Sequence, residues 1–175
     1  MNITHIFFAK DSQYKHIEDF AFWNYNSANA LGYKLEGIYL PESIRTIGQY
    51  AFAQLYDPTL KVIDGITTNL NNAITSIGAY AFVGGLVVKS IIAPLALPAD
   101  LQTLGNYAFR YNEAADFTEI PDNVSILPEY CFASAPNICI NTFGRNTNKL
   151  TTIQSNCFAG SGTTSGTAIT DLYFG

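Results

Sequence analysis

Hydrophobic positions along the chain follow a six-residue template that recurs six times. The template is an aliphatic residue, two variable positions, an aromatic residue, a small residue and a phenylalanine. The copies, called hooks below, end at Phe22, Phe52, Phe82, Phe109, Phe132 and Phe158, and begin five residues earlier in each case. Successive hooks lie 30, 30, 27, 23 and 26 residues apart. Six copies in order are very unusual by chance, so the pattern predicts a repeat protein.

A second, strand-like element lies upstream of each hook. Its clearest copy is residues 35–40, where Ile38 and Leu40 alternate with Tyr39 and Pro41 ends the strand, because proline cannot donate to a sheet ladder. The same phase predicts strands within residues 3–8, 60–65, 88–93 (ending at Pro94), 115–120 and 169–174, and one near 138–142 whose register is ambiguous by two residues. We therefore expect about seven short strands in one parallel sheet, with helical or irregular hooks opposite.

One strand and one hook cannot bury their own apolar side chains, so the coils must stack. The inward Ile, Leu, Tyr and Phe side chains are then expected to form aligned columns in a continuous core. The small hook residue, alanine or cysteine, fits a tight position between coils. The sequence predicts a strand-rich α/β-type solenoid over residues 1–175, a single domain of about six repeats with a final strand at 169–174.

The segment Pro41-x-x-Ile44-x-x-Ile47-Gly-x-Tyr50-Ala-Phe52 resembles the BspA-like leucine-rich repeat. The resemblance covers nearly the whole chain, and the Tyr-Ala-Phe hook is not typical of other leucine-rich repeats. It implies a right-handed leucine-rich-repeat coil of the kind found on the surfaces of bacteria and some parasitic protists, where family members act in adhesion or host-protein binding. The chain departs from the family pattern in its uneven repeat lengths and in lacking the usual cysteine just after the hook.

A partner is expected to bind the exposed side of the strands. If Ile38 and Leu40 and their equivalents face inward, the residues between them form a continuous stripe. This stripe comprises Phe7, Tyr39, Asp64, Ile92, Glu119, then Cys139 or Asn141, and Tyr173. Exposed aromatic and apolar side chains on a rigid face are typical of protein-binding surfaces. The alternative is that the aromatic residues only reflect β propensity.

Composition and charge exclude several classes of protein. The chain is 48% hydrophobic and 13% charged, which argues against disorder. Its nine basic residues are scattered, so no patch for nucleic acid can be assembled. No apolar run is long enough to span a membrane, and no signal peptide is visible. The resemblance implies a cell-surface or extracellular protein; a fragment of a larger protein, an intracellular effector or a phage-encoded binder remain alternatives.

No grouping of residues points to catalysis, a metal or a cofactor. The chain has two histidines and no metal-binding or phosphate-binding motif. The carboxylate pairs Glu18–Asp19 and Glu119/Asp122 are interpreted as a solvated rim, although acid–base chemistry is a remote alternative. For Cys131, Cys139 and Cys157, reduced thiols are favoured over a disulfide, because parallel side chains in a stack make poor bonding geometry.

The sequence therefore predicts a non-enzymatic module that binds a macromolecule, expected to be a protein of a host or neighbouring cell surface or matrix, through the strand face. The alternative is a structural spacer, or a unit that associates with itself through an uncapped C-terminal end. That end would be the open edge of the strand at 169–174.

Overall fold

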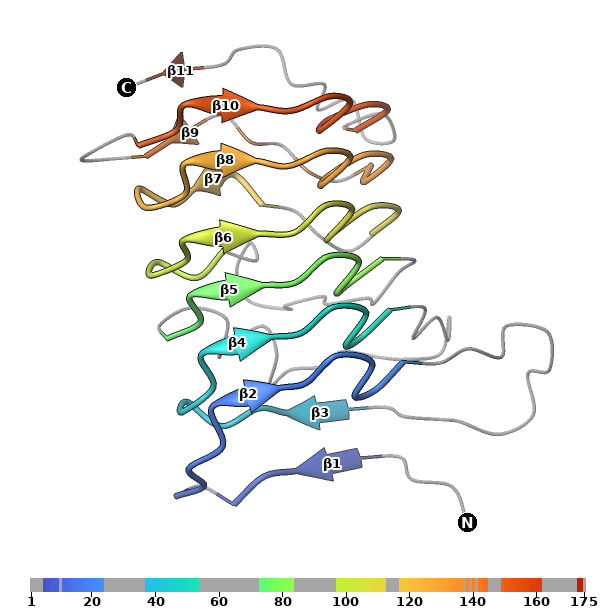
Figure 1. Cartoon of the computed structure of the whole chain (residues 1–175), viewed down its shortest axis with the longest axis vertical. Helices are drawn as coiled ribbons and strands as arrows, with labels where there is room; N and C mark the ends of the chain where they lie inside the picture. The colour runs from blue at the N-terminus through green and yellow to red at the C-terminus, as the bar shows by residue number, and fades with distance from the viewer. Residues whose placement is uncertain are drawn as a thin grey trace, which may run out of the picture.

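The chain folds as a stack of short coils along one axis, with its two ends at opposite ends of the stack (Figure 1). A computed structural model describes residues 5–9, 11–23, 37–53, 73–83, 97–112, 117–136, 138, 140, 142–144, 149–161 and 173–174. The expected solenoid is confirmed, and the described hooks are irregular turns without a helix.

The strands predicted upstream of the hooks form one side of the stack. They are β1 (His5–Phe7), β3 (Gly37–Tyr39), β7 (Glu119–Ile120), β9 (Thr142–Phe143) and β11 (Tyr173–Phe174). They pair in parallel as β1–β3 and as β11–β9–β7. The strands predicted at 60–65 and 88–93 lie outside the described residues.

The expectation of a single sheet is wrong, because a second set of parallel strands runs along the other side of each coil. These are β2 (His16–Ile17), β4 (Thr46–Ile47), β5 (Ser76–Ile77), β6 (Thr103–Leu104), β8 (Ile126–Leu127) and β10 (Thr152–Ile153). They pair as β2–β4–β5–β6 and as β10–β8, and they run opposite to β1, β3 and β11 (Figure 1). Each has two residues, too few to show an alternating pattern in the sequence.

One strand boundary differs from the sequence prediction. β9 ends at Phe143, beyond the predicted range, because Phe143 pairs with Ile120 and is fully buried. A proline turn lies at Pro98, where Leu101 N–H donates to Pro98 O at 3.0 Å, as Ile44 N–H donates to Pro41 O at 3.1 Å. Pro94, at which the sequence predicts the end of a strand, lies outside the described residues.

Backbone hydrogen bonds tie each hook to the next. Tyr50 N–H donates to Ala79 O and Phe52 N–H to Ala81 O, both at 2.9 Å, and the later hooks repeat this pattern. The fourth residue of every hook has a positive φ of 54° to 62°, although none of these residues is glycine. The members of this set are Phe20, Tyr50, Tyr80, Tyr107, Tyr130 and Asn156. This left-handed conformation costs a side chain about 1–2 kcal/mol, which packing between coils must offset.

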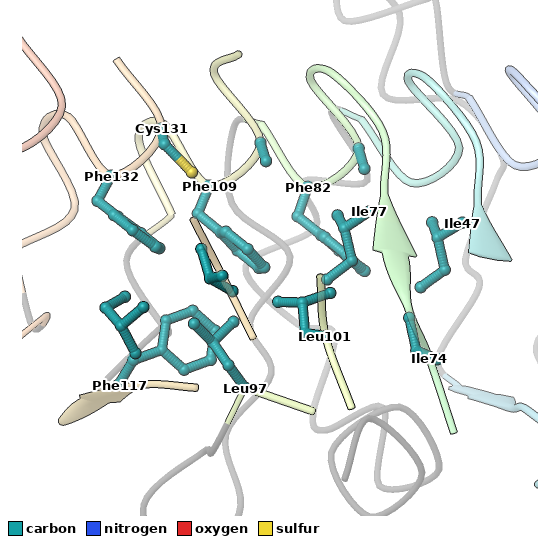
Figure 2. Packing of buried hydrophobic residues seen from close by; sticks show 14 of the residues in the cluster. Ile47, Ile74, Ile77, Phe82, Leu97, Leu101, Phe109, Phe117, Cys131 and Phe132 are labelled. Carbon is teal, nitrogen blue, oxygen red and sulfur yellow. The ribbon is translucent and has the colours of Figure 1, made fainter. Parts of the chain in front are cut away.

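The core is built around a column of stacked phenylalanines, one from each hook. Their ring centroids lie 5.2 to 5.8 Å apart, with neighbouring rings within 13° of parallel. Figure 2 shows Phe82, Phe109 and Phe132 in this row, with Phe117 meeting it from the opposite strand. Phe117 contacts Phe109 edge to face at 4.9 Å. The aligned apolar columns expected from the repeat are thus confirmed for the phenylalanines and for the aliphatic residues beside them.

Glycine occupies the second position of the second, third and fourth hooks, where a side chain would not fit. A Cβ atom at Gly78 would lie 2.6 Å from both the Gln49 N and Gly48 C backbone atoms, and Gly48 and Gly105 are similarly crowded. Because backbone atoms cannot move aside, these glycines set how closely the coils approach.

Candidate binding surface

The first part of the predicted stripe lies on β1 and β3. Phe7 pairs in register with Tyr39, as Ile6 does with Ile38. The Phe7 side chain is 69% exposed, whereas Ile6 and Phe8 on either side pack against the core. The alternation predicted for this strand is therefore observed, and it places a large aromatic ring in solvent.

The second part of the stripe lies on β7, β9 and β11. Glu119 and Tyr173 occupy the same register position, each paired with Thr142 of the strand between them. Thr142 thus takes the place predicted for Cys139 or Asn141, both of which lie outside the described residues. Asp64 and Ile92 also lie outside them, and their places in the stripe stay predictions.

On β7 the inward and outward positions differ from the prediction. Thr118 was expected to face inward with Ile120, but Thr118 is exposed and its neighbour Phe117 is fully buried. Glu119 itself is half-buried. Buried positions are here three residues apart, as they are at Ile140 and Phe143. The exposed residue at β7 is therefore Thr118, beside the half-buried Glu119.

A second surface, missed by the sequence interpretation, runs along the hooks. Tyr50, Tyr80, Tyr107 and Tyr130, called the tyrosine ladder below, were expected inside the core but are half-buried. Their rings stack at centroid distances of 4.6, 4.6 and 5.0 Å, within 8° of parallel. The stack continues onto Phe20 at 5.3 Å. The sequence does contain a signal for this surface: the fourth hook position is tyrosine more often than phenylalanine. A fully buried tyrosine hydroxyl needs a hydrogen-bond partner, so a repeated tyrosine indicates a position that reaches solvent.

Arg110 lies beside one end of the ladder. Its guanidinium carbon is 5.4 Å from the ring centroid of Tyr107, 5.1 Å from that of Tyr130 and 4.5 Å from that of Tyr111. Arg110 Nη2 also donates to the Tyr111 hydroxyl at 2.8 Å. The guanidinium is thus held against three aromatic rings, an arrangement that stabilises a cation on π systems.

Burial raises the pKa of Tyr80 and of Tyr107. For Tyr80 the neighbouring Tyr50 raises the pKa further, and Arg110 opposes the shift; for Tyr107 the second cause is the Glu129 carboxylate. Both phenols are therefore neutral at physiological pH.

The acidic side chains of the described residues do not gather into a metal site. Among them, no three His, Cys, Asp or Glu side chains are close enough to hold a metal ion. The carboxylate of Asp19 has a structural role, since its Oδ1 accepts the Gln49 N–H at 2.6 Å. No helix in this part of the chain is long and apolar enough to cross a membrane.

Cys131 and Cys157 are free, buried thiols that replace the hook alanines in the last two coils. Burial raises the pKa of both, that of Cys157 to about 12, so they act as small apolar groups.

Stacked coils with short in-register parallel strands, a shared phenylalanine column and an exposed strand face define a leucine-rich-repeat solenoid. The sequence matches the family model described as a BspA type leucine-rich repeat region, in six copies over residues 1–56 and 64–172. The chain therefore belongs to the BspA-type leucine-rich-repeat family, as its hooks had suggested. Proteins of this repeat family are typically non-catalytic.

Solved structures with a similar fold come from bacteria. A leucine-rich cell surface protein of Faecalibacterium prausnitzii is 18% identical, with a TM-score of 0.52 over 94% of this chain and 49% of that one. The leucine-rich-repeat protein of T. pallidum is 18% identical, with a TM-score of 0.46 over 86% of this chain and 73% of that one. A leucine-rich-repeat protein of Bacteroides ovatus is 15% identical, with a TM-score of 0.43 over 91% of this chain and 50% of that one. The chain thus spans about half the length of two of these proteins. No curated protein matches the sequence.

Proposed function

We propose that this protein is a non-catalytic binding module that recognises a protein partner through its strand face, at the surface of a bacterial cell. The observation that carries the proposal is the 69% exposed ring of Phe7, held between two inward-facing residues on a rigid strand. Aromatic residues supply much of the binding energy at protein interfaces, and an exposed ring at a defined position on a strand is available for such a contact. The cell-surface description of the F. prausnitzii protein supports the proposed location.

The chemistry of the strand face suggests what such a partner presents. Glu119 shares a register position with Thr142 and Tyr173, so one acidic group lies in line with two uncharged groups along this part of the face. A lysine or arginine of the partner would lie opposite Glu119, while an apolar side chain would cover Phe7. Isolated charges of this kind mainly select the partner and its orientation, and the aromatic contact supplies most of the affinity.

Paired variants on opposite sides of the solenoid test the proposal. Phe7→Ser/Glu119→Lys removes one exposed apolar group and reverses one charge on the strand face. Ile126→Ser/Glu18→Lys makes the same two changes on the side formed by β2, β4, β5, β6, β8 and β10, where both residues are exposed. Each purified chain is used to capture proteins from extracts of cell-surface and matrix material, and circular dichroism verifies folding.

We expect the wild type and the Ile126→Ser/Glu18→Lys control to capture the same partner and the strand-face variant to lose it. Loss of one hot-spot contact of this type lowers affinity by at least about tenfold. Equal capture by all three folded chains would contradict binding through the strand face.

Self-association is a second candidate, suggested by the position of β11. This strand pairs with β9 on one side and has no second strand beside it among the described residues. A parallel edge strand can pair with another copy of the chain. Light scattering over a hundredfold concentration range distinguishes the candidates: a mass that stays that of a monomer argues against self-association.

A further inference from the structure

The tyrosine ladder brings four phenols into contact that are far apart in the sequence. Tyr50 and Tyr80 stack at 4.6 Å with their rings 2° from parallel, and Tyr80 and Tyr107 stack at 4.6 Å and 6°. The equivalent positions in the first and last hooks are Phe20 and Asn156, which carry no phenol. The ladder is therefore a limited set of phenols in fixed contact.

The backbone holds this arrangement in place. Each of these tyrosines has a left-handed backbone, and each hook is hydrogen-bonded to the next, for instance by Tyr80 N–H to Asn106 O at 2.9 Å. The phenylalanine column beneath fixes the same spacing between coils. The rings are nevertheless half-buried rather than buried, so small molecules and enzyme-generated radicals can reach their edges.

We propose that the tyrosine ladder is a site of oxidative modification, where a haem peroxidase with hydrogen peroxide joins neighbouring tyrosines of one chain into dityrosine. Each phenol loses one electron and one proton to give a phenoxyl radical, whose unpaired spin extends to the ring carbons beside the C–O bond. Two such radicals form one carbon–carbon bond, and the two hydrogens on the joined carbons return as protons to restore the phenols. Overall, two tyrosines lose one hydrogen each, and hydrogen peroxide is reduced to two water molecules.

Contact between the rings determines which tyrosines react together. A radical formed in the ladder meets its partner without diffusion, and such preorganised reactions can have effective concentrations far above those reached by separate molecules. The Arg110 guanidinium lies beside Tyr107 and Tyr130 at 5.4 and 5.1 Å and shields that pair, whose rings are also 5.0 Å apart. We therefore expect the main products to be Tyr50–Tyr80 and Tyr80–Tyr107.

Cross-linking would join neighbouring coils by a covalent bond. A Tyr50–Tyr80 bond encloses the 30 residues that separate two hooks. Closing a loop of this length restricts the unfolded chain and is expected to raise the thermal unfolding midpoint by roughly 5 to 15 °C.

The test compares the wild type with Tyr80→Phe and Tyr14→Phe after treatment with a haem peroxidase and hydrogen peroxide. Tyr80→Phe keeps the stacked ring but removes the phenol shared by both expected products. Tyr14→Phe is the matched control, because Tyr14 is 61% exposed and therefore more accessible than any ladder residue, yet the aromatic ring that packs against it among the described residues is that of Phe8, which is not a phenol. Dityrosine fluorescence gives the yield, and mass spectrometry of digested monomer identifies the linked peptides.

We expect monomeric wild type and Tyr14→Phe to form dityrosine in equal yield, independent of protein concentration, with linked peptides that contain Tyr80. The yield should fall severalfold in Tyr80→Phe. The proposal is overturned if the monomer contains no dityrosine while free tyrosine reacts in the same solution, if Tyr80→Phe gives the wild-type yield, or if the products join Tyr14 or other exposed tyrosines between chains.

Discussion

At the scale of the residue, the two aromatic positions of each hook have different environments although they are only two residues apart. The phenylalanine that ends the hook is buried in a continuous column, as Phe52 and Phe82 are. The tyrosine before it is half-buried and stacks on its equivalents in neighbouring coils. Both columns stabilise the same contact between coils, but in the inner coils only the tyrosines also reach solvent.

Replacement of single phenylalanines tests the importance of the column. Phe82 is stacked between Phe52 and Phe109 and is fully buried, so Phe82→Ala should lower the free energy of unfolding by about 3–5 kcal/mol. Phe158 is half-buried and stacks only on Phe132 among the described residues. Phe158→Ala should therefore cost clearly less. Urea unfolding of both variants measures the difference, and equal costs would contradict the column as the source of stability.

The buried thiols predict how stability depends on pH. Burial raises the pKa of the Cys157 thiol to about 12 in the folded chain, whereas in the unfolded chain this pKa lies near its ordinary value of 9.0. The unfolded state therefore loses its proton first, so stability is complete below pH 9 and decreases as the pH rises toward 12. The raised pKa values of Cys131, Tyr80 and Tyr107 act in the same direction.

Urea unfolding between pH 8 and 11 checks this dependence. In Cys157→Ala the free energy of unfolding should decrease less steeply with pH than in the wild type. Alanine is a suitable replacement because it occupies the same position in the first four hooks. A variant with the same pH dependence as the wild type would show that the thiol of Cys157 does not titrate as its burial requires.

At the scale of the element, close approach of the hooks depends on glycine. Gly78→Ala should lower the free energy of unfolding by more than about 2 kcal/mol, because the added Cβ meets backbone atoms of the preceding coil. Gln102→Ala, at an exposed position beside β6, is the control and should stay within about 0.5 kcal/mol of the wild type. If Gly78→Ala left the free energy of unfolding unchanged, the coils would have to be farther apart than they are in the structure.

The elements also show how far the sequence could predict the fold. All six hooks lie where the template placed them, because each combines a local turn with inward aliphatic and phenylalanine side chains. The two-residue strands before the hooks were missed, since pairing between coils, rather than any local pattern, creates them. The turn at Pro98 was missed for a related reason: the burial of Leu97 and Leu101 in the stack, on either side of it, is not displayed by the sequence.

The candidate surface was predictable to a similar degree. Phe7, Tyr39, Glu119 and Tyr173 occupy the expected register positions. The replacement of Cys139 or Asn141 by Thr142 depended on how β9 pairs, and the exposure of the tyrosine ladder depended on how the hooks pack on one another. Neither follows from alternation along a single strand.

At the scale of the whole molecule, the described residues form two surfaces on one stack of coils. The strand face combines an exposed aromatic ring with isolated polar groups, and the hook side carries the tyrosine ladder. A solenoid has contacts mainly between adjacent coils, so a local change on one surface is expected to leave the other intact. This separation is what allows variants of the two surfaces to serve as controls for each other.

Hydrogen exchange of the chain, alone and bound to a captured partner, tests the strand-face account most directly. We expect the partner to slow exchange of the backbone amides in residues 5–9, 117–120 and 142–144, and to leave residues 126–130 and 152–158 on the hook side unchanged. Protection confined to the hook-side segments would contradict the account and would place the binding surface on the other side of the solenoid.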